Sequence, residues 1–443
     1  MTRADEPEVH TSTAPRYAII GAGPSGLAGA RTFQKHGLDF DGFEAASEVG
    51  GLWNIDNPRS TMYESAHLIS SRTTTEFTEF PMPDGTPDYP GHKALQQYFV
   101  GFSREFDLAR HFRFDTEVTG IDRVDGGWRV TWKDKAGTGS AMYTGVVLAN
   151  GTLATPSVPS FPGTFTGELL HSSQYKSADV FRGKRVLIIG AGNSGCDIAV
   201  DAVHHAASID MSVRRGYYFV PRYLLGRPAD TLNPSRMLPA RVKQWIDSRF
   251  LKLFTGDPVK FGFPEPDYRI YESHPIVNTL VLGHLGQGDL RIRPDIDRFE
   301  GTTVYFTDGT SDDYDLVMLA TGYELDYGFI DKSHLNWTGM APTLFLNIFG
   351  SDIGSTTFNG VYVLGMVEAI GLGWQGRYEQ AELLARYLAA EQATRHGFEE
   401  LAAKRWPDLT GGYHYLGIER MSYYVNKDVY RHVLKKLTRT LKE

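Results

Sequence analysis

The sequence contains very little cysteine, with Cys196 as the single one among 443 residues. An enzyme that passes electrons through a dithiol needs two cysteines, so this class of redox protein is excluded. Cys196 directly follows a glycine at the expected start of a helix. We interpret it as a small packing residue rather than as a reactive thiol.

Long apolar runs and an excess of positive charge are also missing. No segment approaches the roughly 20 apolar residues that are needed to span a bilayer. The chain has 45 Lys and Arg against 53 Asp and Glu, which argues against bulk binding to nucleic acid or to an anionic membrane. Residues 1–14 are polar and acidic, so we expect a disordered tail rather than a signal peptide. These features predict a cytoplasmic protein.

Glycine, by contrast, recurs in two copies of one pattern. Residues 17–26 (YAIIGAGPSG) and 186–195 (VLIIGAGNSG) each join an apolar strand to a G-x-G-x-x-G loop and a helix. Such glycines permit a tight turn and close approach of the backbone to a pyrophosphate, which rests on the helix N-terminus. The residues predicted to contact nucleotides are Gly21, Gly23, Pro24, Ser25 and Gly26 in the first loop and Gly190, Gly192, Asn193, Ser194 and Gly195 in the second.

The strand that follows each glycine loop ends in a charged residue, and the sign of this charge differs between the two copies. After the first copy the strand ends in Glu44, and after the second it ends in Arg214 and Arg215. A carboxylate at this position accepts hydrogen bonds from ribose hydroxyls, whereas a guanidinium binds a 2′-phosphate. The sequence therefore predicts FAD at the first loop and NADPH at the second.

The order of the motifs predicts an α/β fold in which one dinucleotide-binding domain is nested in another. Two similar apolar strands flank the second glycine loop, and we assign the small residues at their ends, Ala149, Thr321 and Gly322, to cofactor binding because they let the backbone pass close to a bound cofactor. We expect two Rossmann-like domains, with an NADPH-binding domain over 156–318 inserted in a discontinuous FAD-binding domain. The predicted segments are a FAD-binding part over 15–155, an aromatic and helical insertion over about 217–300, and a second FAD-binding part with C-terminal helices over 319–443.

Three shorter motifs accompany the two loops. Residues 165–175 follow the spacing F-x-G-x-x-x-H-x-x-x-Y, residues 48–53 end in G-G-x-W, and residues 320–323 read A-T-G-Y. Over residues 17–386 this combination resembles the flavin-containing monooxygenase family. The resemblance implies that NADPH reduces FAD, that NADP stays bound, and that a C4a-(hydro)peroxyflavin formed with O₂ oxygenates the substrate. The flavin would carry this chemistry, in agreement with the lack of an obvious catalytic triad or metal-binding cluster.

The resemblance also assigns residues to the cofactors. Gly51, Leu52 and Trp53 match the flavin loop, and we include Val118, in a predicted hairpin strand, among the cofactor contacts. His171 reads as a structural histidine at the domain junction. Ser173 and Tyr175 are assigned to cofactor binding, with a role in capping the linker between the domains as the alternative.

One position departs from the family pattern. Family members carry an asparagine, which hydrogen-bonds flavin and NADP, ten residues before an acidic-aromatic-proline triplet. In this chain the triplet begins at Glu79, and Ile69 occupies the asparagine position. Because an apolar side chain cannot donate a hydrogen bond, the candidate catalytic residues become the neighbouring Ser70, Ser71 and His67.

Three functions remain open at this stage. The first is oxygenation of a soft nitrogen or sulfur centre in a small hydrophobic molecule, including indole-like molecules. The second is Baeyer–Villiger oxidation, although Tyr175 is followed by Lys176 where that signature expects proline. The third is a flavoprotein that does not oxygenate, either an NADPH oxidase or a redox sensor. The expected partners are the substrate and O₂, with no nucleic acid, and a homodimer is left open.

Overall fold

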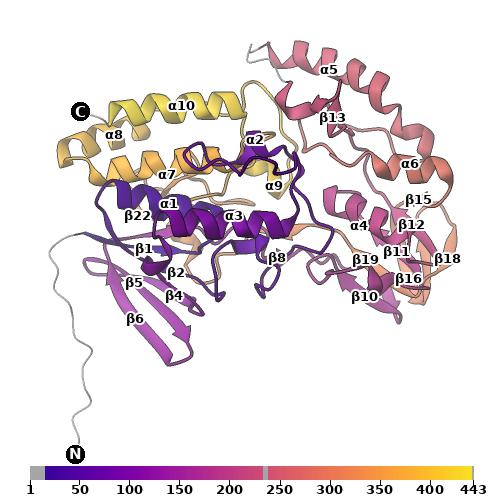
Figure 1. Cartoon of the computed structure of the whole chain (residues 1–443), viewed down its shortest axis with the longest axis horizontal. Coiled ribbons are helices and arrows are strands. Elements are labelled where there is room, and N and C mark those ends of the chain that lie inside the picture. Colours follow the sequence, from indigo (N-terminus) through magenta and orange to yellow (C-terminus); the bar gives the residue numbers. More distant parts are fainter. Residues whose placement is uncertain (1–14, 233–237, 442–443) are drawn as a thin grey trace, which may run out of the picture.

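The computed structural model describes residues 15–232 and 238–441. The predicted tail, residues 1–14, lies outside the described residues. Figure 1 shows two α/β units side by side, each built around its own sheet. None of the helices in the described ranges is long and apolar enough to cross a membrane.

The first unit contains a six-stranded sheet. In spatial order its strands are β21 (Phe349–Ser351), β22 (Phe358–Val363), β7 (Gly145–Leu148), β1 (Arg16–Ile20), β2 (Asp39–Phe43) and β3 (Phe112–Arg113). Strand β1 is parallel to both β2 and β7, and β22 is parallel to β7. The sheet thus combines strands from both ends of the chain, as the nested arrangement requires.

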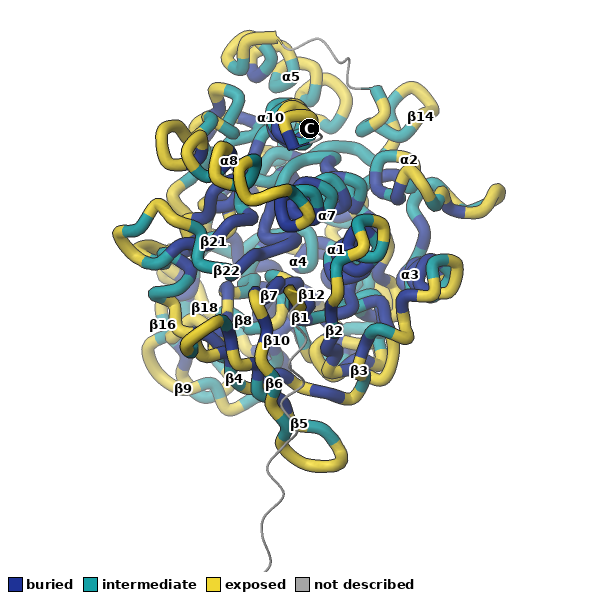
Figure 2. The backbone as a smooth tube through the Cα atoms, turned by 90° about the vertical axis from the view of Figure 1, so that its left-hand side faces the viewer, coloured by how far each residue is buried: buried dark blue, intermediate teal, exposed yellow. Residues whose placement is uncertain are grey.

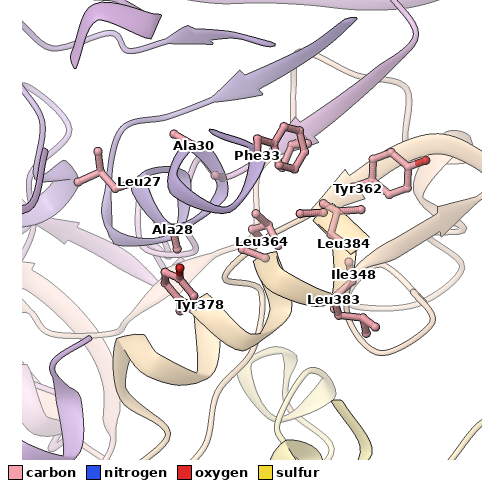
Figure 3. Packing of buried hydrophobic residues seen from close by; sticks show 14 of the residues in the cluster. Leu27, Ala28, Ala30, Phe33, Ile348, Tyr362, Leu364, Tyr378, Leu383 and Leu384 are labelled. Atoms are coloured by element: carbon pink, nitrogen blue, oxygen red, sulfur yellow. The ribbon is translucent and has the colours of Figure 1, made fainter. Parts of the chain in front are cut away.

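Alternating residues of β1 divide the first unit into two cores. Tyr17 and Ile19 pack into a cluster with the helices α1 (Pro24–Lys35), α3 (His92–Glu105), α7 (Gly373–Ala389) and α10 (Lys427–Thr440). Figure 3 shows side chains of α1 and α7 meeting beside Leu364. Ala18 and Ile20 point to the opposite face, which the antiparallel strands β4 (Glu117–Val124), β5 (Gly127–Asp134) and β6 (Gly137–Tyr143) cover.

The second unit contains a five-stranded parallel sheet. Its strands are β10 (Glu168–His171), β19 (Leu316–Leu319), β11 (Arg185–Ile189), β12 (Ser208–Ser212) and β15 (Arg291–Arg293). One face packs on α4 (Asn193–Val203) and α6 (Leu280–Gln287). The other face packs on a smaller sheet made of β9 (Gly163–Phe165), β16 (Ile296–Gly301), β17 (Thr303–Phe306) and β18 (Ser311–Asp313). The expected α/β fold with two Rossmann-like units, one inserted in the other, is confirmed.

The two chain crossings between the units lie beside each other. Strand β8 (Thr155–Pro156) pairs antiparallel with β20 (Tyr323–Glu324). Next to this pair, the Ser157 N–H donates to the Gly322 carbonyl at 3.0 Å, and the Thr321 hydroxyl donates to the Ser157 carbonyl at 2.6 Å. The second unit therefore leaves and rejoins the first at one hydrogen-bonded point.

The aromatic and helical insertion forms the outer end of the second unit (Figure 1). It contains β13 (Tyr223–Leu224), β14 (Arg227–Pro228), the 3₁₀ turns η4 (Ala229–Thr231) and η5 (Pro258–Phe261), and the helix α5 (Ala240–Thr255). Gln244 is the one buried residue of α5. Large apolar residues of this helix, including Trp245 and Leu253, are exposed (Figure 2).

The remaining elements are short turns and C-terminal helices. They are η1 (Gly51–Trp53), α2 (Arg72–Thr75), η2 (Ala109–His111), η3 (Ala178–Phe181), η6 (Lys332–Leu335), α8 (Gln392–Lys404) and α9 (Glu419–Ser422). Of these, η1 lies against the first glycine loop and α2 contacts α7, and both contribute residues to the wall of the site described next.

Candidate functional site

A cavity of about 870 Å³ lies between the two units and is lined by both. Its wall includes the first glycine loop, the start of α4, the segment 66–70, the segment 368–374 and parts of the insertion. Of the residues predicted to bind cofactor or to act in catalysis, those on this wall are Gly21, Gly23, Pro24, Ser25, Glu44, Gly51, Leu52, Trp53, His67, Ser70, Val118, Ala149, Gly192, Asn193, Ser194 and Gly322.

The first glycine loop is shaped by close backbone contacts. Gly21 has a φ of +106°, and a Cβ added there would lie 2.6 Å from the Ala149 carbonyl oxygen. A Cβ at Gly51 would lie 2.9 Å from the Gly23 Cα. Because Gly51 carries no side chain, the G-G-x-W segment can rest directly against the first glycine loop at the start of α1. The helix N-terminus is thereby left open to the cavity.

Glu44 lies at the cavity wall with its carboxylate already held in place. It accepts hydrogen bonds from the Ala22 N–H at 2.6 Å and the Ala46 N–H at 2.9 Å. Burial raises the pKa of Glu44, and these two hydrogen bonds oppose the effect. Each carboxylate oxygen keeps a further lone pair, so Glu44 can still accept a ribose hydroxyl.

The second glycine loop repeats the geometry of the first. Gly190 has a φ of +105°, and a Cβ there would lie 2.6 Å from the Ala320 carbonyl oxygen. A Cβ at Gly195 would lie 2.1 Å from the Gly190 carbonyl oxygen, so both glycines pack the turn and neither lines the cavity. Gly192 faces open space, which leaves room for a phosphate at the N-terminus of α4.

Asn193 lines the cavity, but its side chain is already engaged within the protein. Its Nδ2 donates to the Pro275 carbonyl at 3.2 Å, and its Oδ1 accepts from the Val277 N–H at 2.8 Å. The side chain therefore fastens the insertion to the second glycine loop. Sequence reasoning assigned Asn193 to the cofactor and missed this contact, which joins residues far apart in the chain.

Arg214 and Arg215 follow β12, and neither lines the cavity. Arg214 is exposed. The Arg215 guanidinium lies 3.5 Å from the Asp267 carboxylate and 5.9 Å from the centre of the Tyr268 ring. Their place, at the end of the strand after the second loop, is the one expected from the sequence.

His171 joins the second sheet to the chain crossing. The Ser173 N–H donates to its Nδ1 at 3.1 Å, so the proton resides on Nε2, which donates to the Gly322 carbonyl at 3.1 Å. Burial lowers the pKa of His171 and favours this neutral form. These contacts agree with the structural role expected for His171 at the domain junction.

Besides Gly190, Gly195, Arg214 and Arg215, five further predicted site residues lie off the cavity wall. The Tyr175 hydroxyl donates to Asp201 at 2.8 Å, and the Tyr175 ring is buried against Phe181. The Ser173 hydroxyl lies 3.0 Å from His171 Nδ1. The Thr321 hydroxyl is used in the chain crossing, and Gly26 packs against Gly21. The fifth is Ser71.

The three candidate catalytic residues do not lie together in the structure. Ser70 lines the cavity, and its hydroxyl lies 2.8 Å from the Thr75 hydroxyl. The N–H and hydroxyl of Ser71 both donate to Asp230, at 2.7 and 3.0 Å, so this serine faces the insertion. His67 lines the cavity with its Nδ1 2.7 Å from the Ser65 carbonyl oxygen. Ser70 and His67 thus line the cavity together with Ile69, whereas Ser71 does not.

Ionisable side chains from distant segments also line the cavity. Arg377 donates to the Gly373 and Val367 carbonyls at 2.9 and 3.2 Å. Burial lowers the pKa of His274 to about 3, so this histidine is neutral near pH 7. Its Nδ1 lies 3.0 Å from the Tyr424 hydroxyl. Glu368 and Arg420 complete this part of the wall, and sequence reasoning selected none of the four because no shared motif connects them.

The comparisons with known proteins agree with this geometry. A model of the flavin-binding monooxygenase-like family matches residues 14–392. Flavin-containing monooxygenase 1 from Mus musculus is 32% identical over 378 residues, which cover 80% of this chain and 70% of the mouse protein.

Two solved structures show the same fold. S-allyl-L-cysteine S-oxygenase from Allium sativum has a TM-score of 0.64 and 20% identity, over 96% of this chain and 88% of that one. A cyclohexanone monooxygenase mutant from Rhodococcus sp. Phi1, bound to NADP⁺, has a TM-score of 0.69 and 19% identity, over 95% and 97%. The chain therefore belongs to the flavin-binding monooxygenase-like family and is an NADPH-dependent FAD monooxygenase.

Proposed function

We propose that this chain places one oxygen atom on a soft nitrogen or sulfur centre of a small, largely hydrophobic molecule. The observation that carries the proposal is the single cavity that both glycine loops share with an apolar wall. That wall comes from the insertion and includes Leu238, Ile246, Phe250 and Leu251. A cavity with apolar walls and a few polar groups is typical of sites for small organic ligands.

The residues at the first loop fit FAD. The open N-terminus of α1 suits the pyrophosphate, and Glu44 can accept the ribose hydroxyls. The contact between Gly23 and Gly51 leaves no room for a side chain and lets the cofactor approach the backbone. Trp53, from the flavin loop, lines the same wall and lies edge-on to Trp374. We assign these residues to FAD.

The residues at the second loop fit NADPH. The start of α4, with Gly192 and Ser194 on the cavity wall, suits the pyrophosphate. Arg214 and Arg215 follow the next strand and provide positive charge for the 2′-phosphate. Because the two loops open onto one cavity, the two cofactors can meet there.

The reaction balances with the substrates that this enzyme class uses. FAD held by the residues of the first loop would supply the redox chemistry that couples the oxidation of NADPH to the reduction of O₂. One oxygen atom enters the product and the other leaves as water, while NADPH and one proton are consumed. The protein's own part is to bind both nucleotides in one enclosed space and to hold the substrate in it.

Ile69 favours a second candidate function, an NADPH oxidase that releases hydrogen peroxide. Ile69 lines the cavity where the family pattern expects a hydrogen-bonding asparagine, so one contact to the reacting atoms is lost. Baeyer–Villiger oxidation is the third candidate. The similar cyclohexanone monooxygenase supports it only through the shared fold.

Isotopically labelled O₂ tests the proposal. Purified FAD-loaded enzyme is supplied with NADPH, labelled O₂ and, in parallel reactions, a tertiary amine, a thioether and a ketone. The proposal predicts label in an N-oxide or a sulfoxide, with one labelled oxygen atom in each product molecule and the remaining NADPH recovered as peroxide. Label in an ester instead would establish the Baeyer–Villiger reaction. NADPH oxidation that yields only peroxide with every substrate would establish the oxidase.

A further inference from the structure

One carboxylate of the insertion is bound by the first unit. Asp230 lies in the turn η4, and its Oδ2 atom accepts three hydrogen bonds from residues of the first unit. The donors are the Ser71 N–H at 2.7 Å, the Ser71 hydroxyl at 3.0 Å and the Thr74 hydroxyl at 2.6 Å. These donors belong to α2 or to the residue directly before it. The insertion and the start of α2 are therefore joined through one acceptor atom.

The Asp230 carboxylate caps α2 from another part of the molecule. Ser71 is the residue before the helix, and in the described chain its own side chain makes no capping hydrogen bond. The first N–H groups of a helix have no acceptor within the helix itself. In a capping box, an acidic side chain of the same helix accepts the N–H of the preceding residue. Asp230 accepts this N–H instead, and α2, with four residues, is too short to be stable without such contacts.

The start of α2 follows directly on two residues of the cavity wall. Ile69 and Ser70 line the cavity, and Ser71, the next residue, is held by Asp230. The Ser70 hydroxyl lies 2.8 Å from the hydroxyl of Thr75, the last residue of α2, so its direction depends on where the helix lies. Position 69 is also the one at which the family pattern expects an asparagine. The placement of this part of the wall thus depends on a residue of the insertion.

The turn that carries Asp230 contributes to the cavity wall as well. Ala229 and Leu232, which flank Asp230 in the chain, both line the cavity. The Ala229 N–H donates to the Arg222 carbonyl at 2.9 Å, which fastens the turn to the hairpin of β13 and β14. A displacement of this turn would move its apolar cavity residues and the Asp230 carboxylate together. The wall of the insertion and the segment 69–75 are therefore connected.

The second oxygen of the Asp230 carboxylate shows that stability alone does not explain this residue. Its Oδ1 atom is buried and has no hydrogen-bond partner in the part of the chain that the structure describes. A buried acceptor without a donor lowers the stability of a protein. The carboxylate is kept at the cavity wall in spite of this cost.

We propose that Asp230 is a positioning residue for oxygen transfer, which holds Ile69 and Ser70 in place through the start of α2. When this contact is lost, the segment 69–75 moves and more of the O₂ is released as hydrogen peroxide. In that side reaction NADPH and one proton supply two electrons and two hydrogen atoms to O₂, and the substrate is left unchanged. This inference rests on the proposed oxygenation and on the expected place of the segment beside the reacting atoms.

Product ratios and hydrogen exchange test the proposal on the FAD-loaded enzyme, with benzyl ethyl sulfide as the thioether. The variant D230A removes the acceptor of all three hydrogen bonds. We expect the ratio of peroxide to sulfoxide to rise about twofold to fivefold. The rate of anaerobic flavin reduction by NADPH should change less than about twofold. Amide exchange over α2 should become at least about tenfold faster, as for the loss of one charge-assisted hydrogen bond.

Partial variants test whether the contact itself is responsible. D230N keeps an oxygen that can accept the Ser71 N–H, so it should show a smaller rise than D230A. S71A keeps two of the three donors, and its product ratio should stay close to that of the parent. T74V removes one donor and should raise the ratio slightly. Added to D230A, T74V should change the ratio little further, because the shared contact has already been lost.

The matched control is D257A, which removes a carboxylate elsewhere in the insertion. Asp257 accepts the Val259 N–H at 3.2 Å at the start of η5, and it does not line the cavity. Neither the product ratio nor amide exchange over α2 should change in this variant. FAD content and thermal unfolding of every variant separate a change in positioning from a loss of folding.

The outcomes distinguish this inference from the proposed function. If the parent forms the sulfoxide and D230A leaves the ratio of peroxide to sulfoxide unchanged, the positioning role is refuted and the proposed function stands. A rise of equal size in D257A, or an equal slowing of anaerobic flavin reduction in D230A, would refute the role as well. If the parent oxygenates neither a thioether nor a tertiary amine, the proposed function fails and this inference fails with it.

Discussion

At the scale of single residues, Arg214 and Arg215 are expected to set the choice between NADPH and NADH. Each charge-assisted hydrogen bond to a 2′-phosphate contributes about 1.5–3 kcal/mol, so losing one should weaken NADPH roughly tenfold or more. The variants R214A and R215A, compared by the kcat/KM ratio for the two cofactors, measure this. Arg215 also contacts Asp267, so its loss should have the smaller effect. An unchanged ratio in both variants would place the phosphate elsewhere.

Ile69 is the residue expected to determine how much NADPH is lost to peroxide. Ile69→Asn places a hydrogen-bond donor on the cavity wall, and one added bond of about 1 kcal/mol should slow the leakage roughly fivefold. Peroxide formed per NADPH oxidised, measured with a saturating thioether, gives the result.

Two neighbouring serines provide the control for this segment. Ser70 lines the cavity, so Ser70→Ala should increase peroxide release. The Ser71 hydroxyl is bound to Asp230, so Ser71→Ala should leave the leakage unchanged. If the parent enzyme oxidises NADPH without releasing peroxide, and all three variants do the same, this segment does not control the reaction.

At the scale of elements, Asn193 connects α4 to the insertion. Asn193→Ala removes two hydrogen bonds and leaves the Val277 N–H without its partner, which should cost about 1–3 kcal/mol of stability. We expect faster proteolysis within 213–290 and a lower unfolding temperature, with unchanged FAD content. Ser194→Ala is the matched control, because Ser194 lines the same wall without fastening the insertion. Equal proteolysis of both variants would contradict this role.

The elements that could be predicted from the sequence are those whose motif residues lie close together in the chain. Each nucleotide unit combines an apolar strand, a glycine spacing and a charged strand end, and all three lie within about thirty residues. The structure places the A-T-G-Y motif at the chain crossing, where His171 of the F-x-G-x-x-x-H motif contacts the Gly322 carbonyl. The contact of Gly51 with Gly23 leaves no room for a side chain at Gly51, which is why this position of the pattern requires glycine.

The parts of the site that could not be predicted depend on contacts between distant segments. Glu368, His274 and Arg420 come from three regions that meet only in the folded chain. The direction of a side chain is equally invisible in the sequence. Ser71 and Tyr175 stand next to cavity residues but turn towards Asp230 and Asp201.

At the scale of the whole molecule, residues 157–322 are expected to fold on their own. Helices and strands from within this range pack on both faces of the second sheet, with Tyr63 and Ala66 added from the first unit, and the ends of the range are already hydrogen-bonded to each other. A fragment of these residues should unfold cooperatively and bind NADPH, more weakly than the whole enzyme, without binding FAD. Thermal unfolding with and without NADPH measures both properties. If the fragment is unfolded, the second unit requires the first unit in order to fold.

The pairing of β8 with β20 has a consequence for how such an enzyme could arise. The two strands run antiparallel with Pro156 opposite Tyr323, so a two-residue turn could join them into a hairpin. The first unit would then be a continuous chain, and the second unit occupies the place of that turn. One insertion event at a surface hairpin would have been sufficient to supply the second nucleotide, and the same junction offers a position for exchanging this unit between relatives.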